Sequence, residues 1–175
     1  MNNPKLPFLL CLCLALLACK GPEPIRTQPT VEETSGLASI VSVADNARSG
    51  QLLSGFYQLE GNAWRWTGQK FSVALGVPAR AVRDGADLVL SFSVPEPAIQ
   101  DLKTIALSAK IGATDLGSET YDKAGAFQYR RSVPAPAFNG KNVVNVDFTL
   151  DKVYKAPNDR RDLGVIVRSI GLELK

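Results

Sequence analysis

From about residue 37 onward, apolar and polar side chains alternate along the chain, and this alternation restricts its fold more than any other feature. A period of two places the apolar side chains on one face of an extended strand, so each run predicts a strand with one buried face. The apolar members of six runs are Phe71, Val73, Leu75 and Val77; Leu88, Leu90, Phe92 and Val94; Ile105, Leu107, Ala109 and Ile111; Phe127, Tyr129 and Val133; Val144, Val146, Phe148 and Leu150; and Ile166, Ile170, Leu172 and Leu174.

Residues typical of turns separate these runs. They gather at 67–69, 83–85, 95–97, 139–141 and 156–159. Glycine and asparagine accept a positive φ, and proline holds φ near about −65°, so such clusters interrupt strands. About eight short strands and no helical period longer than two turns predict an all-β fold. The expected architecture is a two-sheet antiparallel β-sandwich, jelly-roll-like.

The start of the chain has the pattern of an export signal. A basic residue, Lys5, precedes an uncharged, leucine-rich run over residues 8–18. This run is shorter than the roughly 20 apolar residues that a membrane-spanning helix needs, and it ends at a small residue, as secretory signals do. The alternative is an ordinary secretory signal with cysteines in its apolar part, since Cys11 and Cys13 also lie there.

The residues Leu16-Leu17-Ala18-Cys19 resemble the lipobox of bacterial lipoproteins, although Leu17 replaces the small residue that usually stands there. The resemblance implies cleavage before Cys19, a diacylglyceryl group on its sulfur and an acyl group on its amine. Two or more chains anchor a protein firmly to a membrane. By resemblance to enterobacterial sorting, Lys20 in place of aspartate implies an outer-membrane lipoprotein.

Three segments therefore divide the chain. Residues 1–18 are the expected signal peptide, residues 19–36 a lipid-anchored tether, and residues 37–175 the β-sandwich domain. The tether contains much proline, threonine and glutamate and has no apolar period, as is typical of an extended linker.

Composition excludes several function classes. Without residues 1–18, Cys19 is the only cysteine, so an internal disulfide cannot form. The chain has no histidine, which removes the commonest general base and the commonest transition-metal ligand. The net charge is +3 with no basic block, so nucleic acid is not an expected partner. The acidic residues show no paired spacing, and no nucleophile motif is present, so we expect no enzyme activity and no cofactor.

The most distinctive segment is 55–68, which gathers four aromatic residues. Trp64 and Trp66 are two residues apart, so on a strand they share one face while Arg65 points the other way. An exposed indole pair with Tyr57 would give a flat surface for the apolar face of a sugar ring. The alternative is that the indoles fill the core or cover one end of the sandwich, as large aromatic residues usually do.

A second candidate lies at residues 158–162, where charges of both signs precede the last run. Arg160 or Arg161 could bind a ligand carboxylate or phosphate in bidentate fashion. The alternative is that Asp159 and an arginine hold the loop locally.

Segment 55–68, the alternating run that follows it and residues 159–165 together resemble a jelly-roll β-sandwich domain of bacterial cell-envelope proteins. Such domains are similar to carbohydrate-binding modules. The resemblance covers about residues 50–175 and implies the fold, with no catalytic residue to carry over.

Two functions follow as expectations. The first is a noncatalytic envelope lipoprotein whose sandwich binds a carbohydrate or another envelope ligand through Tyr57, Trp64, Trp66, Arg160 and Arg161. The second is a structural or assembly lipoprotein that binds another envelope protein through strand edges or loops. In both, the membrane is a partner through Cys19.

Overall fold

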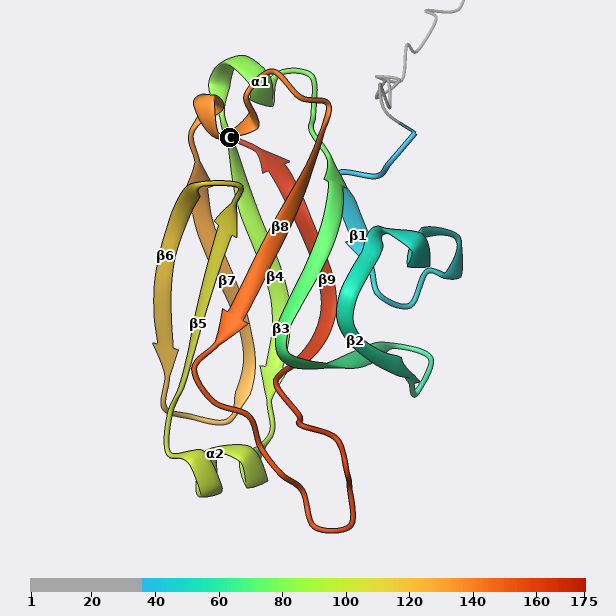
Figure 1. Cartoon of the computed structure of the whole chain (residues 1–175), viewed down its shortest axis with the longest axis vertical. Coiled ribbons are helices and arrows are strands. Elements are labelled where there is room, and N and C mark those ends of the chain that lie inside the picture. Colours follow the sequence, from blue (N-terminus) through green and yellow to red (C-terminus); the bar gives the residue numbers. More distant parts are fainter. Residues whose placement is uncertain (1–35) are drawn as a thin grey trace, which may run out of the picture. The chain divides into compact units, whose positions relative to one another are not determined.

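The computed structural model describes residues 36–175, and the signal peptide, Cys19 and nearly all of the tether lie outside them. The elements in chain order are β1 (Ile40–Ser42), η1 (Asn46–Gln51), β2 (Leu52–Glu60), β3 (Trp64–Gly76), α1 (Ala81–Asp84), β4 (Ala86–Val94), α2 (Glu96–Leu102), β5 (Ile105–Ile111), β6 (Thr114–Tyr121), β7 (Gly125–Val133), η2 (Ala135–Phe138), β8 (Val143–Leu150) and β9 (Ile166–Leu174). The predicted all-β antiparallel β-sandwich is confirmed, with nine strands over these residues (Figure 1).

The strands form one antiparallel path that folds into two layers. Its order is β6-β5-β8-β3-β9-β4-β7, with β1 added to β9 and β2 added to β3. One layer contains β6, β5 and β8, and the other contains β7, β4 and β9 (Figure 1). Alternate side chains of both layers meet in one core, as the period of two predicted.

Strand β3 belongs to both layers. Its start pairs with β9 at Arg65 and Trp66, and its second part pairs with β8 from Lys70 to Gly76. The turn expected at residues 67–69 is therefore wrong, because the strand runs through it. Gly68 lies between the two pairings, where a residue without a side chain permits a bend.

Strand β9 contains a second difference from the expected pattern. Ile166 was expected on the buried side with Ile170, but Val167 is the buried residue and Ile166 is partly exposed. The pairing with β4 shifts here, since Ser169 is opposite Ser91 and Val167 is opposite Phe92. Arg168 is the extra residue of this β-bulge, which reverses the alternation.

The proline pair at 95–97 ends β4 as expected, but it also begins helix α2. Pro97 lies in the first turn of the helix, where its missing N–H leaves no helical hydrogen bond unmade. Ala98 is fully buried, so this short helix covers one end of the sandwich.

Aromatic rings fill the centre of the core. Phe71 on β3 and Phe148 on β8 stack with their ring centroids 4.7 Å apart, and both rings are almost fully buried. Tyr129, from the opposite layer, meets Phe148 edge-on at 6.4 Å. These contacts connect the two layers through large apolar surfaces, which supply most of the stabilisation in a sandwich.

Side chains close the side of the sandwich where β6 and β7 meet without a main-chain ladder. The Tyr129 hydroxyl donates to the Gly117 carbonyl, and burial raises the pKa of this phenol. Arg131 lies over the Tyr129 ring, donates to the Ser118 carbonyl at 3.2 Å and pairs with Glu119 at 2.9 Å. These groups cover strand edges that would otherwise be open to pairing with another chain.

We predict that Phe148→Ala lowers the free energy of unfolding by about 3–5 kcal/mol, because it removes a buried ring and leaves a cavity between the layers. Thr149→Ala, the neighbouring residue on the outward side of β8, should change it by no more than about 0.5 kcal/mol. Urea denaturation monitored by circular dichroism measures both. Equal losses in the two variants would contradict the assigned register.

Candidate functional site

Trp64 and Trp66 both lie on the outward side of β3. Arg65 and the buried Thr67 point to the opposite side of the strand, as the spacing predicted. Both indoles are partly exposed, and neither belongs to the hydrophobic core cluster. The pair therefore lies outside the core, and its partial burial agrees with the alternative in which the indoles cover one end of the sandwich as well as with a ligand surface.

The strand register extends this surface across four strands. Trp66 is opposite Ile166 on β9, Ile166 is opposite Ser93 on β4, and Ser93 is opposite Ala126 on β7. Adjacent strands are separated by about 4.8 Å, so this row is about 14 Å long. A hollow of about 250 Å³ lies at its far end, where Ser91, Gln128 and Arg168 provide polar groups. We call this surface the tryptophan face; it comprises Trp64, Trp66, Ser91, Ser93, Ala126, Gln128, Ile166 and Arg168.

The β2–β3 hairpin fixes the position of Trp64. Glu60 and Trp64 are register partners across a three-residue turn. Gly61 in this turn has φ +55°, and a side chain there would approach the Trp64 ring within 2.5 Å. The indole therefore lies against glycine backbone, which supports one side of the ring and leaves part of it exposed.

The charged loop after β8 is joined to this hairpin by Arg161. Its guanidinium donates to both carboxylate oxygens of Asp159, at 3.1 Å to Oδ1 and 2.7 Å to Oδ2, and also to Glu60 at 2.7 Å. The guanidinium carbon lies 5.2 Å from the centre of the Tyr57 ring, and the Tyr57 hydroxyl donates to the Asp162 carbonyl at 3.1 Å. We call Tyr57, Glu60, Asp159 and Arg161 the Arg161 cluster.

The Arg161 cluster changes the ionisation of its own members. Hydrogen bonds from the Arg161 side chain, and one from its backbone, lower the pKa of the Asp159 carboxyl below its ordinary value. The same contacts, first with Asp159 and then with Glu60, raise the pKa of Arg161. Asp159 and Arg161 therefore both keep their charges over the whole neutral range, which maintains the ion pair within the loop.

The structure thus brings together only part of the predicted ligand set. Tyr57 and Arg161 contact one another although 104 positions separate them, and Glu60 connects them to the strand position opposite Trp64. Arg160 is exposed and makes no hydrogen bond or ion pair within residues 36–175. For Arg161 the geometry favours the alternative in which an arginine holds the loop, because its guanidinium is already engaged.

Sequence reasoning missed two groups. Arg65 donates to the Val43 carbonyl at 3.0 Å and to the Tyr57 carbonyl at 3.1 Å, so it supports the tryptophan pair from behind. Ser91, Gln128 and Arg168 come from three different strands, and no local pattern joins them. The outward parity of Ser91 and Gln128 in their runs was readable beforehand, but that of Arg168 was not, because it lies in a bulge.

Within the described part of the chain, no group of three cysteine, aspartate or glutamate side chains could hold a metal ion. In the same residues, no helix is long and apolar enough to cross a membrane.

Comparison with known proteins gives similarity of structure alone. No protein-family model matches the chain, and no curated protein matches it by sequence. The fold is similar to a mannan-recognising carbohydrate-binding module, TmCBM27, with 14% identity over 78% of this chain and 95% of the module, at a TM-score of 0.46. It is also similar to the module CsCBM6-3 of Clostridium stercorarium, solved with cellobiose, with 14% identity over 79% of this chain and 95% of the module, at a TM-score of 0.42.

We predict that acid loosens the loop through Asp159. Because the folded-state pKa of Asp159 is lowered, its contribution is complete above the ordinary pKa of the carboxyl and is lost as the pH falls through the lowered value. Hydrogen-exchange protection of the Tyr154 and Leu163 amides, which bond across the loop, should therefore fall at low pH.

Arg161→Gln should reduce this protection already at neutral pH and flatten its dependence on acid. Arg160→Ala is the matched control, because this neighbouring arginine makes no such contacts, and it should behave like the natural sequence. An unchanged profile in Arg161→Gln would contradict the role of the Arg161 cluster.

Proposed function

We propose that this protein is a noncatalytic binding module of the bacterial cell envelope, which holds a carbohydrate chain on its tryptophan face. The observation that carries the proposal is that the only two tryptophans of the chain lie together, outside the core and partly exposed, at one end of the row that continues through Ile166, Ser93 and Ala126. A partly exposed indole keeps part of its apolar surface available to a ligand, and two such residues on the same side of one strand support the proposal.

The residues of the face suit a sugar. An indole ring offers a flat apolar surface to the C–H side of a pyranose, while the remaining hydroxyls need donors and acceptors. Ser91, Gln128 and Arg168 supply these groups around the hollow. The row of about 14 Å between Trp66 and Ala126 gives space for a chain of sugars rather than one ring.

The other predicted residues take different parts in this proposal. Tyr57 and Arg161 hold the hairpin and the loop in place beside the indoles, through the contacts within the Arg161 cluster. Arg160, whose guanidinium is exposed, is the arginine of this loop that a ligand can reach.

We predict that Trp64→Ala weakens binding of the preferred oligosaccharide at least about tenfold, because it removes one stacking surface. The variant should lose less free energy of unfolding than the about 3–5 kcal/mol that is lost when a buried aromatic residue is replaced by alanine. Calorimetric titration with cello- and manno-oligosaccharides measures binding, and urea denaturation measures stability.

Each tryptophan can also be observed separately, since the chain has two. Trp64→Phe leaves only Trp66 and Trp66→Phe leaves only Trp64, so acrylamide quenching of each variant reports one indole. We expect both to be quenched and the bound oligosaccharide to protect at least one. Emission that resists quenching and ignores every oligosaccharide would contradict the proposal.

A second candidate function is docking to another envelope protein. Ile40 on β1 is 53% exposed and Leu53 on β2 is 48% exposed. Among the described strands, β1 pairs only with β9 and β2 only with β3, so both leave an edge without a partner. Apolar side chains on open edges suit strand addition by a protein partner.

We further propose that the protein is a lipoprotein of the outer membrane, anchored at Cys19. The support is the sequence alone: an apolar run that ends in Leu16-Leu17-Ala18-Cys19, followed by Lys20. With several acyl chains at one residue, dissociation from the membrane becomes negligible.

We predict that Cys19→Ser abolishes labelling by radioactive palmitate and releases the domain from the membrane fraction. Cys13→Ser is the matched control, because it removes a cysteine of the same apolar run without touching the cleavage site. Mass spectrometry of the mature N-terminus should show an acylated Cys19 in the control. Labelling that persists in Cys19→Ser would contradict the assignment.

A further inference from the structure

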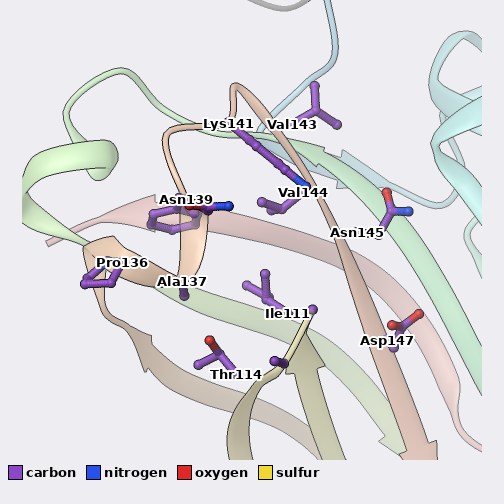
Figure 2. Close-up of a pocket in the computed structure, with 13 residues that line it drawn as sticks. Ile111, Thr114, Pro136, Ala137, Asn139, Lys141, Val143, Val144, Asn145 and Asp147 are labelled. Atoms are coloured by element: carbon purple, nitrogen blue, oxygen red, sulfur yellow. The ribbon is translucent and has the colours of Figure 1, made fainter.

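A larger pocket lies away from the tryptophan face, at the end of the sandwich where β8 begins. Its volume is about 560 Å³, and it is bounded by the β5–β6 turn, by η2 and by the first residues of β8 (Figure 2). The buried side chains of Ile111, Phe138 and Val144 form its apolar wall. Drug-sized ligands occupy pockets of roughly 300–1,000 Å³, so this one has room for a small molecule.

Five polar side chains surround this pocket. They are Thr114, Asn139, Lys141, Asn145 and Asp147. Asn145 and Asp147 are two residues apart on β8 and project to the same side, whereas Asn139 and Lys141 come from the loop after η2 (Figure 2). Residues of three segments far apart in the chain therefore line one pocket, with Asn145 and Asp147 on the side of β8 opposite to the buried Val144.

None of these five side chains is used to hold the fold. Within residues 36–175, no hydrogen bond or ion pair involves the polar head of any of them. The contrast with the Arg161 cluster is informative, since every charged member of that cluster is engaged. Polar groups that line a pocket and do not hydrogen-bond to one another are available to a ligand.

Asn139 is held in a conformation that serves the pocket. Its φ of 48° and ψ of 39° are left-handed, and its backbone N–H bonds to the Pro136 carbonyl. Asparagine tolerates this region better than most residues, so the loop turns sharply after η2 and keeps both Asn139 and Lys141 at the pocket.

We propose that this pocket is a second ligand site, which takes a neutral, hydroxyl-rich molecule of one or two sugar rings. Amides and hydroxyls both donate and accept, as vicinal hydroxyls require, and the apolar wall faces the C–H side of a ring. The charges of Lys141 and Asp147 balance, so the site does not select an ion. This site is independent of the tryptophan face and stands if that face binds nothing.

The test is a titration of the full chain followed by ¹H–¹⁵N NMR. The probes are cellobiose, mannobiose and diacetylchitobiose, with sodium glucuronate as an anionic comparison. At least one neutral disaccharide should shift the amide signals of Asn139, Lys141 and Asn145, and should bind at least tenfold more tightly than glucuronate. No shift at these amides with any neutral disaccharide, or tighter binding of glucuronate, overturns the proposal.

Two variants separate this site from the tryptophan face. The double change Asn145→Ala and Asp147→Ala should weaken binding at the pocket about tenfold or more, as the loss of a charge-assisted hydrogen bond does. Thr149→Ala is the control, because it is the next outward residue of β8 and does not line the pocket. Trp64→Ala should leave these shifts unchanged, and their loss in that variant, or their persistence in the double variant, overturns the assignment. Thermal unfolding verifies that each variant is folded.

Discussion

Thr67, which is fully buried, holds β3 to the segment before β9 at the point where β3 passes from one layer to the other. Its backbone N–H donates to the Val165 carbonyl at 2.9 Å, its carbonyl accepts from Gly164 at 2.7 Å, and its hydroxyl accepts from Val165 at 3.1 Å. A side chain on Gly164 would lie within 2.6 Å of this junction, so glycine is required there. The outward position of Trp66 and the inward position of Phe71 both depend on this connection, because it sets where β3 leaves one layer for the other.

The Arg161 cluster acts on the same region from outside. The long connection between β8 and β9 would be free to move at its tip, but Arg161 joins it to Glu60 on the hairpin that presents Trp64. Charged groups at a surface contribute little to stability as isolated pairs, yet a bidentate pair with a third partner gives a defined geometry. The cluster therefore serves to position the hairpin more than to stabilise the domain. The polar groups around Asn145 and Asp147 show the opposite arrangement, since they are held by strand and loop and remain unpaired.

The strands were the most predictable part of the fold, because alternation in Phe71–Val77 or Leu88–Val94 directly reflects burial on one face. Errors occurred where the main chain departs from regular pairing. Residues 67–69 have the composition of a turn, but the hydrogen bonds of Thr67 to the segment before β9 keep them extended. Ile166 was assigned to the buried face because regular alternation was extended back from Ile170. The bulge at Arg168 breaks that alternation, and since it arises from the pairing with β4, the sequence around Arg168 gives no sign of it.

The sequence by itself determined the period of two, the parity that places Trp64 and Trp66 on one side of a strand, and the chemistry that the absence of histidine removes. Local spacing suffices for these properties, since each concerns a single strand or the composition. The tertiary structure decided whether the indoles face solvent or core, which arginine is engaged, and that Asn139, Lys141, Asn145 and Asp147 surround one pocket. Those properties depend on contacts between residues as far apart as Tyr57 and Arg161. The alternation shows which face of a strand is buried, but it does not show whether a distant loop covers the outward face.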